Sequence, residues 1–179
     1  MTDKKTMWEE AGKAGLILGG ISIAYALLTV LTSKLGTDKA GLAMLISLLN
    51  FGLWAAKFAA CIYLMKLFMT RYAATDSEIT NSQTFGFGVA TALLSAILVA
   101  GFSLANILFI TPDAIDTAFE MISEGYSSML TSDAVDAMEQ MKGMMPQIVF
   151  FSNLIYCFLF GTILSAILSR NIPSTNPFE

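Results

Sequence analysis

The sequence predicts an all-α fold: an integral membrane four-helix bundle with an amphipathic acidic helical hairpin between spans 3 and 4. The 179-residue chain is 55% hydrophobic and 13% charged, so it has too few polar residues to cover a soluble globule of this size. A hydrocarbon core of about 30 Å takes about 20 helical residues to cross. Four apolar runs are long enough, and they lie at about 14–32, 42–65, 85–110 and 148–168. We expect residues 1–179 to form a single membrane domain, with an extramembrane helical insert at 111–146.

Small residues recur at helical spacing in three of the four runs. Gly15 and Gly19 share a face of the first run, and similar stripes begin at Gly88 and Gly161. Such faces let membrane helices approach one another closely. We therefore expect these four glycines to be helix-packing positions, so that Gly19→Leu destabilises the bundle. Leu18→Ile, at a side chain expected to point elsewhere, should change little.

The second run, 42–65, carries polar side chains well inside its length. Asn50, Trp54, Lys57 and Cys61 are spaced by four, three and four residues, so they share one helical face. We expect that face to turn toward protein.

Lys57 has two interpretations, because no Asp or Glu lies within any of the four runs to pair with it. A charge near the bilayer centre costs about 2.5 to 3.5 kcal/mol on insertion scales. The ammonium either snorkels toward the inner headgroups or lines an intramembrane ligand site. That candidate site consists of Lys57, Trp54, Asn50, Ser22 and Ser95, and its ligand would be an anionic lipid or a small solute.

The insert at 111–146 has the pattern of two short amphipathic helices. Residues 111–113 are typical of a helix start, with Thr111 as the capping hydroxyl followed by a proline and an acid. A second helix, capped by Ser132, is expected at 133–144. Seven acids against one lysine give the hairpin a net charge of −6. These residues are Asp113, Asp116, Glu120, Glu124, Asp133, Asp136, Glu139 and Lys142. They are interpreted as a solvated face, with a surface for a cation or a basic partner as the alternative.

The connecting segments are short. Turn residues predict a tight return at 33–40. A polar loop at 70–84 follows the second run, and Asn81 or Ser82 is expected to cap the third helix.

Enzymatic chemistry is not expected. The chain has no histidine, which removes the commonest general base and metal ligand at neutral pH. No nucleophile–base pair is recognisable, so we predict no catalytic residue, no metal, no cofactor and no nucleic-acid partner. Cys61 and Cys157 fall in apolar runs, where packing is expected rather than a disulfide. The methionines of 138–145 suit adaptable packing, with Cu(I) binding through thioethers as the alternative.

Three segments resemble a known family. Residues 8–15, WEEAGKAG, followed by Gly19, resemble the start of small bacterial membrane proteins grouped as domain-of-unknown-function family 4199. Residues 79–88, with Gln83 and Phe85, are similar to that family's motif between the polar loop and the third span. Residues 161–170, GTILSAILSR, are similar to its closing span. The resemblance implies four spans in an inner membrane, and it implies no known activity and no functional residues.

Two functions fit these observations. The favoured one is a non-enzymatic structural or accessory subunit of a cell-envelope assembly, which associates with itself or with another membrane protein and offers its hairpin to a periplasmic partner. The alternative is the binding or transport of an anionic lipid or small solute through the site around Lys57. In both, the lipid bilayer surrounds the spans. The first function needs less special chemistry.

The basic residues near the span ends predict the orientation. With a cytoplasmic amino terminus, six of them lie inside and three outside. The inner residues are Lys4, Lys5, Lys13, Lys66, Arg71 and Arg170, and the outer ones are Lys34, Lys39 and Lys142. Both termini are then cytoplasmic, and the insert faces the periplasm of a bacterial inner membrane.

Single cysteines test this topology. Ser128→Cys and Ser174→Cys are made separately in a background in which Cys61 and Cys157 are replaced by alanine. A membrane-impermeant maleimide added to intact spheroplasts should label position 128 and spare position 174. Labelling at 174 alone would place the hairpin in the cytoplasm.

Overall fold

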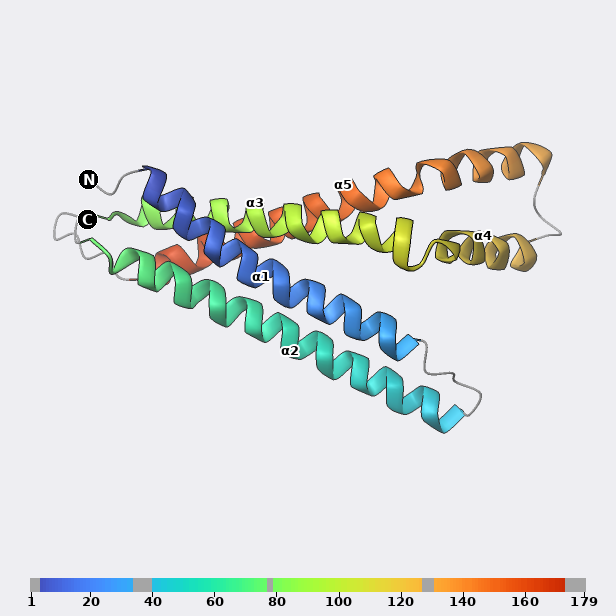
Figure 1. The fold of residues 1–179 in the computed structure, drawn as a ribbon, viewed down its shortest axis with the longest axis horizontal. Coiled ribbons are helices and arrows are strands. Elements are labelled where there is room, and N and C mark those ends of the chain that lie inside the picture. The colour runs from blue at the N-terminus through green and yellow to red at the C-terminus, as the bar shows by residue number, and fades with distance from the viewer. Residues whose placement is uncertain (1–3, 34–39, 77–78, 127–130, 173–179) are drawn as a thin grey trace. The chain divides into compact units, whose positions relative to one another are not determined.

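The chain is almost entirely helical in the computed structural model, which describes residues 4–33, 40–76, 79–126 and 131–172. The α-helices are α1 (Lys4–Ser33), α2 (Ala40–Ala73), α3 (Asn81–Ala105), α4 (Asp113–Gly125) and α5 (Ser132–Asn171) (Figure 1). A π-helical segment, Asn106–Ile110, follows α3 directly. The described residues contain no strand, which confirms the all-α fold. The predicted return loop at 33–40 lies mostly outside them.

Among the described residues, four helices are long and apolar enough to cross a membrane, which supports a multi-pass membrane protein. They are α1, α2, α3 with its π-helical extension, and α5. The helix α5 has 40 residues, or roughly 60 Å at 1.5 Å per residue. That length exceeds a hydrocarbon core of about 30 Å, so part of α5 extends beyond it.

The chain divides into two compact units. Unit 1 contains residues 1–99 and 157–179, and unit 2 contains residues 100–156. Unit 1 therefore holds α1, α2, most of α3 and the end of α5. Unit 2 holds the end of α3, the π-helical segment, α4 and the beginning of α5.

The core of unit 1 gathers where the start of α1 meets the end of α2, the start of α3 and the end of α5. Tyr72 and Phe87 stack at its centre, with ring centroids 4.3 Å apart and planes inclined by 6°. Around them lie small and flexible apolar side chains, including Ala11, Ala14 and Met69. Many large apolar side chains elsewhere on these helices are exposed, as expected for surfaces that face lipid.

Glycines bring α3 and α5 together within unit 1. A Cβ placed on Gly161 would lie 2.5 Å from the Cβ of Ala92. One placed on Gly88 would lie 2.6 Å from the Oγ of Ser165. Only a residue without a side chain fits at either position, so both glycines lie at close approaches between these helices.

Glycines also bring α1 close to α3. A Cβ on Gly15 would lie 2.9 Å from the Cβ of Leu94, and one on Gly19 would lie 3.1 Å from the Cβ of Leu98. Leu18, however, is only 6% exposed and belongs to the core. The expectation that Leu18 points elsewhere is wrong, because the buried arc of α1 is wider than its glycine stripe.

A reciprocal capping box begins α3. The backbone N–H of Thr80 donates to Oε1 of Gln83 at 3.0 Å, and the backbone N–H of Gln83 donates to Oγ1 of Thr80 at 3.3 Å. This arrangement satisfies two backbone donors that the helix start would leave unpaired. Asn81 and Ser82 lie inside the helix, so the prediction that one of them is the cap was wrong.

The caps of the hairpin helices also differ from expectation. Thr111 Oγ1 donates to the carbonyl oxygen of Asn106 at 3.3 Å, and α4 has no side-chain cap. At the start of α5, Oγ1 of Thr131 accepts a bond from the backbone N–H of Ala134 at 3.4 Å. Ser132 is already the first helical residue. The predicted caps Thr111 and Ser132 were therefore wrong.

The helix α5 is continuous, whereas the sequence predicted a short helix at 133–144 and a separate span at 148–168. Pro146 lies inside it. A proline removes one backbone donor and crowds the preceding turn, and on that ground a break was expected. The helix continues through Pro146 all the same, and prolines are tolerated in other membrane helices where neighbouring groups or local adjustments satisfy the freed backbone groups.

Gly161→Ala should destabilise the bundle by roughly 1–3 kcal/mol, because the added methyl group meets Ala92 and forces α3 and α5 apart. Gly20→Ala is the matched control, since a Cβ there meets nothing within 4 Å. Thermal unfolding in mild detergent, followed by circular dichroism, should show a lower Tm for Gly161→Ala alone. Equal melting of both variants would contradict this packing.

Candidate functional site

Polar contacts join α1 to α2, which lie side by side and antiparallel in unit 1 (Figure 1). The pairs are Thr32 with Asn50, Tyr25 with Lys57, and Ser22 with Cys61. The hydroxyl of Thr32 donates to Oδ1 of Asn50 at 2.9 Å. Seven residues along α2 lead from Asn50 to Lys57, and seven back along α1 lead from Thr32 to Tyr25. One register therefore places all three pairs on the same interface.

Lys57 is half-buried in this interface. Its Nζ lies 5.2 Å from the centroid of the Tyr25 ring, within the range of a cation–π interaction, which is worth about 0.5–2 kcal/mol. The thiols of Cys61 and Cys157 are close enough to interact with it electrostatically. The ammonium therefore lies beside α1 at the level of Tyr25.

Trp54 lies apart from these pairs. It is 48% exposed and stacks between Phe51 and Phe58, with centroid distances of 5.8 and 5.7 Å. The ring of Phe58 in turn packs against that of Phe160 of α5, with the ring centroids 5.3 Å apart. The prediction that the whole polar face of the second span turns toward protein is wrong for Trp54, which lies on the exposed edge of that face.

Ser95 lies at a different interface from Ser22. Its backbone nitrogen would be 3.2 Å from a Cβ on Gly15, so it belongs to the contact between α1 and α3. The structure therefore brings Ser22, Asn50 and Lys57 to one interface and places Ser95 at another. That these residues form a ligand site stays a prediction.

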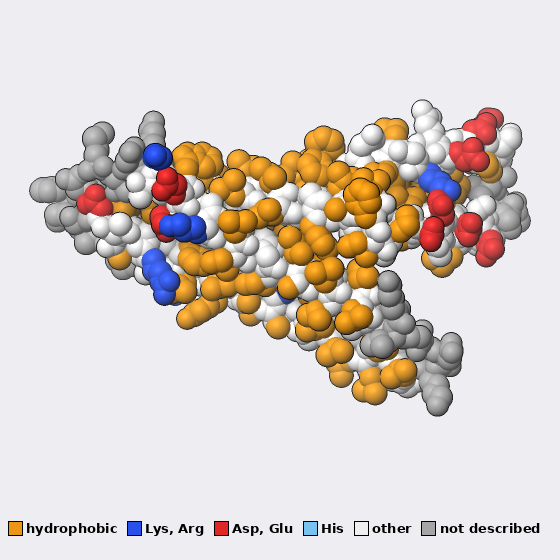
Figure 2. Space-filling model, viewed as in Figure 1, with side chains coloured by type: hydrophobic (Ala, Val, Ile, Leu, Met, Phe, Trp, Pro, Cys, Tyr) orange, Lys and Arg blue, Asp and Glu red, His pale blue; other side chains and the backbone are white. Residues whose placement is uncertain are grey.

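Unit 2 contains the acidic hairpin, formed by α4 and the beginning of α5. All seven predicted acids are exposed. Acidic side chains gather near the right end of the face shown in Figure 2. Lys142 Nζ pairs with Asp116 Oδ1 at 2.6 Å, joining α5 to α4. The hydrogen bond with Asp116 raises the pKa of Lys142, so this lysine carries its charge at neutral pH.

Two cavities lie between α4 and the beginning of α5, of about 170 and 440 Å³. Asp116, Glu139 and Lys142 line both. We call the larger one the hairpin cleft. Its other lining residues are Ile107, Leu108, Pro112, Ile115, Gly143 and Pro146.

The hairpin methionines do not all lie in one enclosed place. Met138 lines the smaller cavity, whereas Met141 and Met144 are about half exposed. Among the residues that the structure describes, no three His, Cys, Asp or Glu side chains lie close enough together to hold a metal ion. Copper binding by the methionines stays an untested alternative.

A family model described as protein of unknown function, DUF4199, matches residues 13–170. The chain belongs to the DUF4199 family. This match confirms the resemblance seen in the sequence. No functionally described protein and no solved structure matches the chain. Membership in DUF4199 therefore assigns no activity, and the function must be argued from the residues themselves.

Proposed function

We propose that this DUF4199 protein is a non-enzymatic structural or accessory subunit of a cell-envelope assembly in a bacterial inner membrane. Its acidic hairpin docks a basic partner on the periplasmic side. The observation that supports this proposal is the uncompensated charge of the hairpin. Seven exposed carboxylates face one lysine, and Asp116 already pairs with that lysine.

The difference in exposure between the two sides of α4 supports a docking role. Ile115 and Phe119 are half-buried, whereas the acids of this helix are exposed. The apolar side of α4 is thus partly covered, with Met121 and Ile122 still exposed, while its charged side meets water. A surface of one sign attracts a partner of the opposite sign and raises the rate of encounter.

Several polar groups in the spans of unit 1 have structural partners, although the hydroxyls of Thr91 and Thr162 are buried without one among the described residues. The contacts between α1 and α2 pair Thr32 with Asn50 and Ser22 with Cys61. Polar pairs of this kind commonly hold membrane helices together. They support a packed scaffold, and none of them provides a base next to a nucleophile.

Neutralising the four hairpin acids that line neither cavity tests the docking surface. The substitutions, made together, are Asp113→Asn, Glu124→Gln, Asp133→Asn and Asp136→Asn. The variant should insert and melt like the wild type but lose its partner, detected by photo-crosslinking from the exposed position 121 and by loss of complementation of a deletion strain. Crosslinking to the wild type should weaken as salt rises.

A matched control neutralises two acids near the amino terminus, with Glu9→Gln and Glu10→Gln. This control should keep both the crosslink and complementation. Full complementation by the hairpin variant would refute docking through the hairpin.

A second function has its own supporting observation, which is the environment of Lys57. Its neighbours are a ring and two thiols, and the sequence places no carboxylate in any of the four apolar runs. Its charge is therefore not neutralised within the spans. An anionic lipid headgroup or the phosphate of a small solute would supply the missing charge.

Lys57→Met removes the charge and keeps the length of the side chain. If the site binds an anionic lipid, the variant should fold like the wild type but retain less phosphatidylglycerol through detergent purification, measured by lipid mass spectrometry. Lys66→Met, at an exposed position, is the control and should retain the wild-type amount. Unchanged lipid together with full complementation by Lys57→Met would leave Lys57 with a structural role only.

A further inference from the structure

We propose that the hairpin cleft binds the headgroup of a phospholipid that carries a primary amine. In this site the lipid phosphate pairs with Lys142, and the lipid ammonium pairs with Asp116 and Glu139. The proposal uses residues different from the four acids that test docking of a basic partner, so the two can fail separately.

The cleft has the polarity that a lipid at the membrane surface requires. Its charged members lie on the hairpin, while Ile107 and Leu108 belong to the π-helical end of the third apolar run. Pro112 and Pro146 line it just beyond the ends of two apolar runs. The cavity of about 440 Å³ therefore lies where the chain passes from apolar to polar sequence. A headgroup can enter it while the acyl chains stay against the exposed side chains of Leu108 and Phe109.

The charges favour a zwitterion. Lys142 pairs with Asp116 at 2.6 Å, and their side chains are 43% and 52% exposed, so this ion pair is open to exchange with a ligand. Glu139 lies one helical turn before Lys142 and makes no hydrogen bond among the described residues. A phosphate and an ammonium would replace one internal pair by charge-assisted bonds to three side chains. A lipid with only negative charge would bring its phosphate next to two carboxylates.

The lining also distinguishes between amines. A primary ammonium has three N–H donors, which match two carboxylates. A quaternary ammonium has none and is recognised by aromatic rings. None of the described residues that line the cleft is aromatic. The cleft therefore suits an ethanolamine headgroup better than a choline headgroup.

Lipid competition on the full-length protein tests the site. The protein is reconstituted in nanodiscs that contain phosphatidylcholine with equal small amounts of phosphatidylethanolamine and phosphatidylglycerol, and the lipids retained after delipidation are measured by native mass spectrometry. The comparison is made in a Lys57→Met background, so that phosphatidylglycerol held at the other proposed lipid site does not enter the ratio. With its hairpin unchanged, this protein should retain phosphatidylethanolamine about 10-fold over the other two, as expected for a charge-assisted bond.

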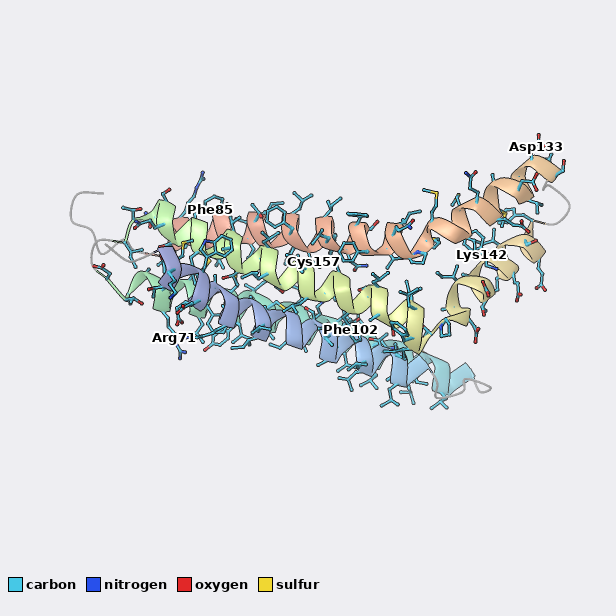
Figure 3. The ribbon with its side chains drawn as sticks, turned by 45° about the horizontal axis from the view of Figure 1, so that its top comes forward. Arg71, Phe85, Phe102, Asp133, Lys142 and Cys157 are labelled. Carbon is cyan, nitrogen blue, oxygen red and sulfur yellow. The ribbon has the colours of Figure 1, made fainter. Side chains whose placement is uncertain are left out.

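Two substitutions should abolish that preference. Glu139→Gln and Asp116→Asn should bring retention to near parity, while Glu124→Gln, the same change outside the cleft, should leave it intact. Lys142 lies on the part of α5 beside α4, and Asp133 lies far from it at the start of α5 (Figure 3). The four-acid docking variant, which includes Asp133, should therefore keep the lipid preference.

Several results would overturn the proposal. They are equal retention of the three lipids by the protein with its hairpin unchanged, preference for phosphatidylglycerol, and undiminished preference in Glu139→Gln. If Asp116→Asn melts early because its ion pair is lost, Glu139→Gln decides the question. Unchanged partner docking by the four-acid variant, with the lipid preference intact, would refute only the proposed function.

Discussion

Lipid gives apolar helices little reason to associate, because acyl chains are as apolar as leucine side chains. The fold of unit 1 therefore depends on how closely backbones can approach, and α3 provides the surface on which that happens. Gly15 and Gly19 bring α1 against Leu94 and Leu98, and Gly161 brings α5 against Ala92. Close contact multiplies small dispersion energies over many atoms. The same geometry fixes the position of α1, and the register between α1 and α2 then places Lys57 beside Tyr25.

The spans and glycine stripes could be predicted because they follow from local properties, namely helical period, side-chain volume and hydropathy. The capping box of Thr80 and Gln83 was also readable in the sequence as a threonine followed three residues later by a glutamine. The continuity of α5 was not readable. The local rule for Pro146 favours a break, whereas the structure has one continuous helix through it.

Only part of the candidate site could be predicted, for a geometric reason. Periodicity shows which residues share an arc of a helix, but it does not give the direction in which that arc points. Asn50 and Lys57 face α1, yet Trp54, on the same predicted arc, lies on its exposed edge. The partner Tyr25 depends on the register between two helices, which no local pattern contains. The hairpin cleft likewise forms only when α4 packs beside a continuous α5.

The charges of Lys142 and Lys57 are stabilised by different surroundings. Lys142 has a carboxylate at 2.6 Å and a side chain that is 43% exposed, so water and Asp116 share the stabilisation of its charge. Lys57 has an aromatic face at 5.2 Å and no carboxylate in its span. A cation–π contact of about 0.5–2 kcal/mol is smaller than the insertion cost of about 2.5–3.5 kcal/mol. The remainder must come from bound anion, water or protein packing. An anionic ligand would therefore stabilise the charge of Lys57 more than it would stabilise the charge of Lys142, which is already paired with Asp116.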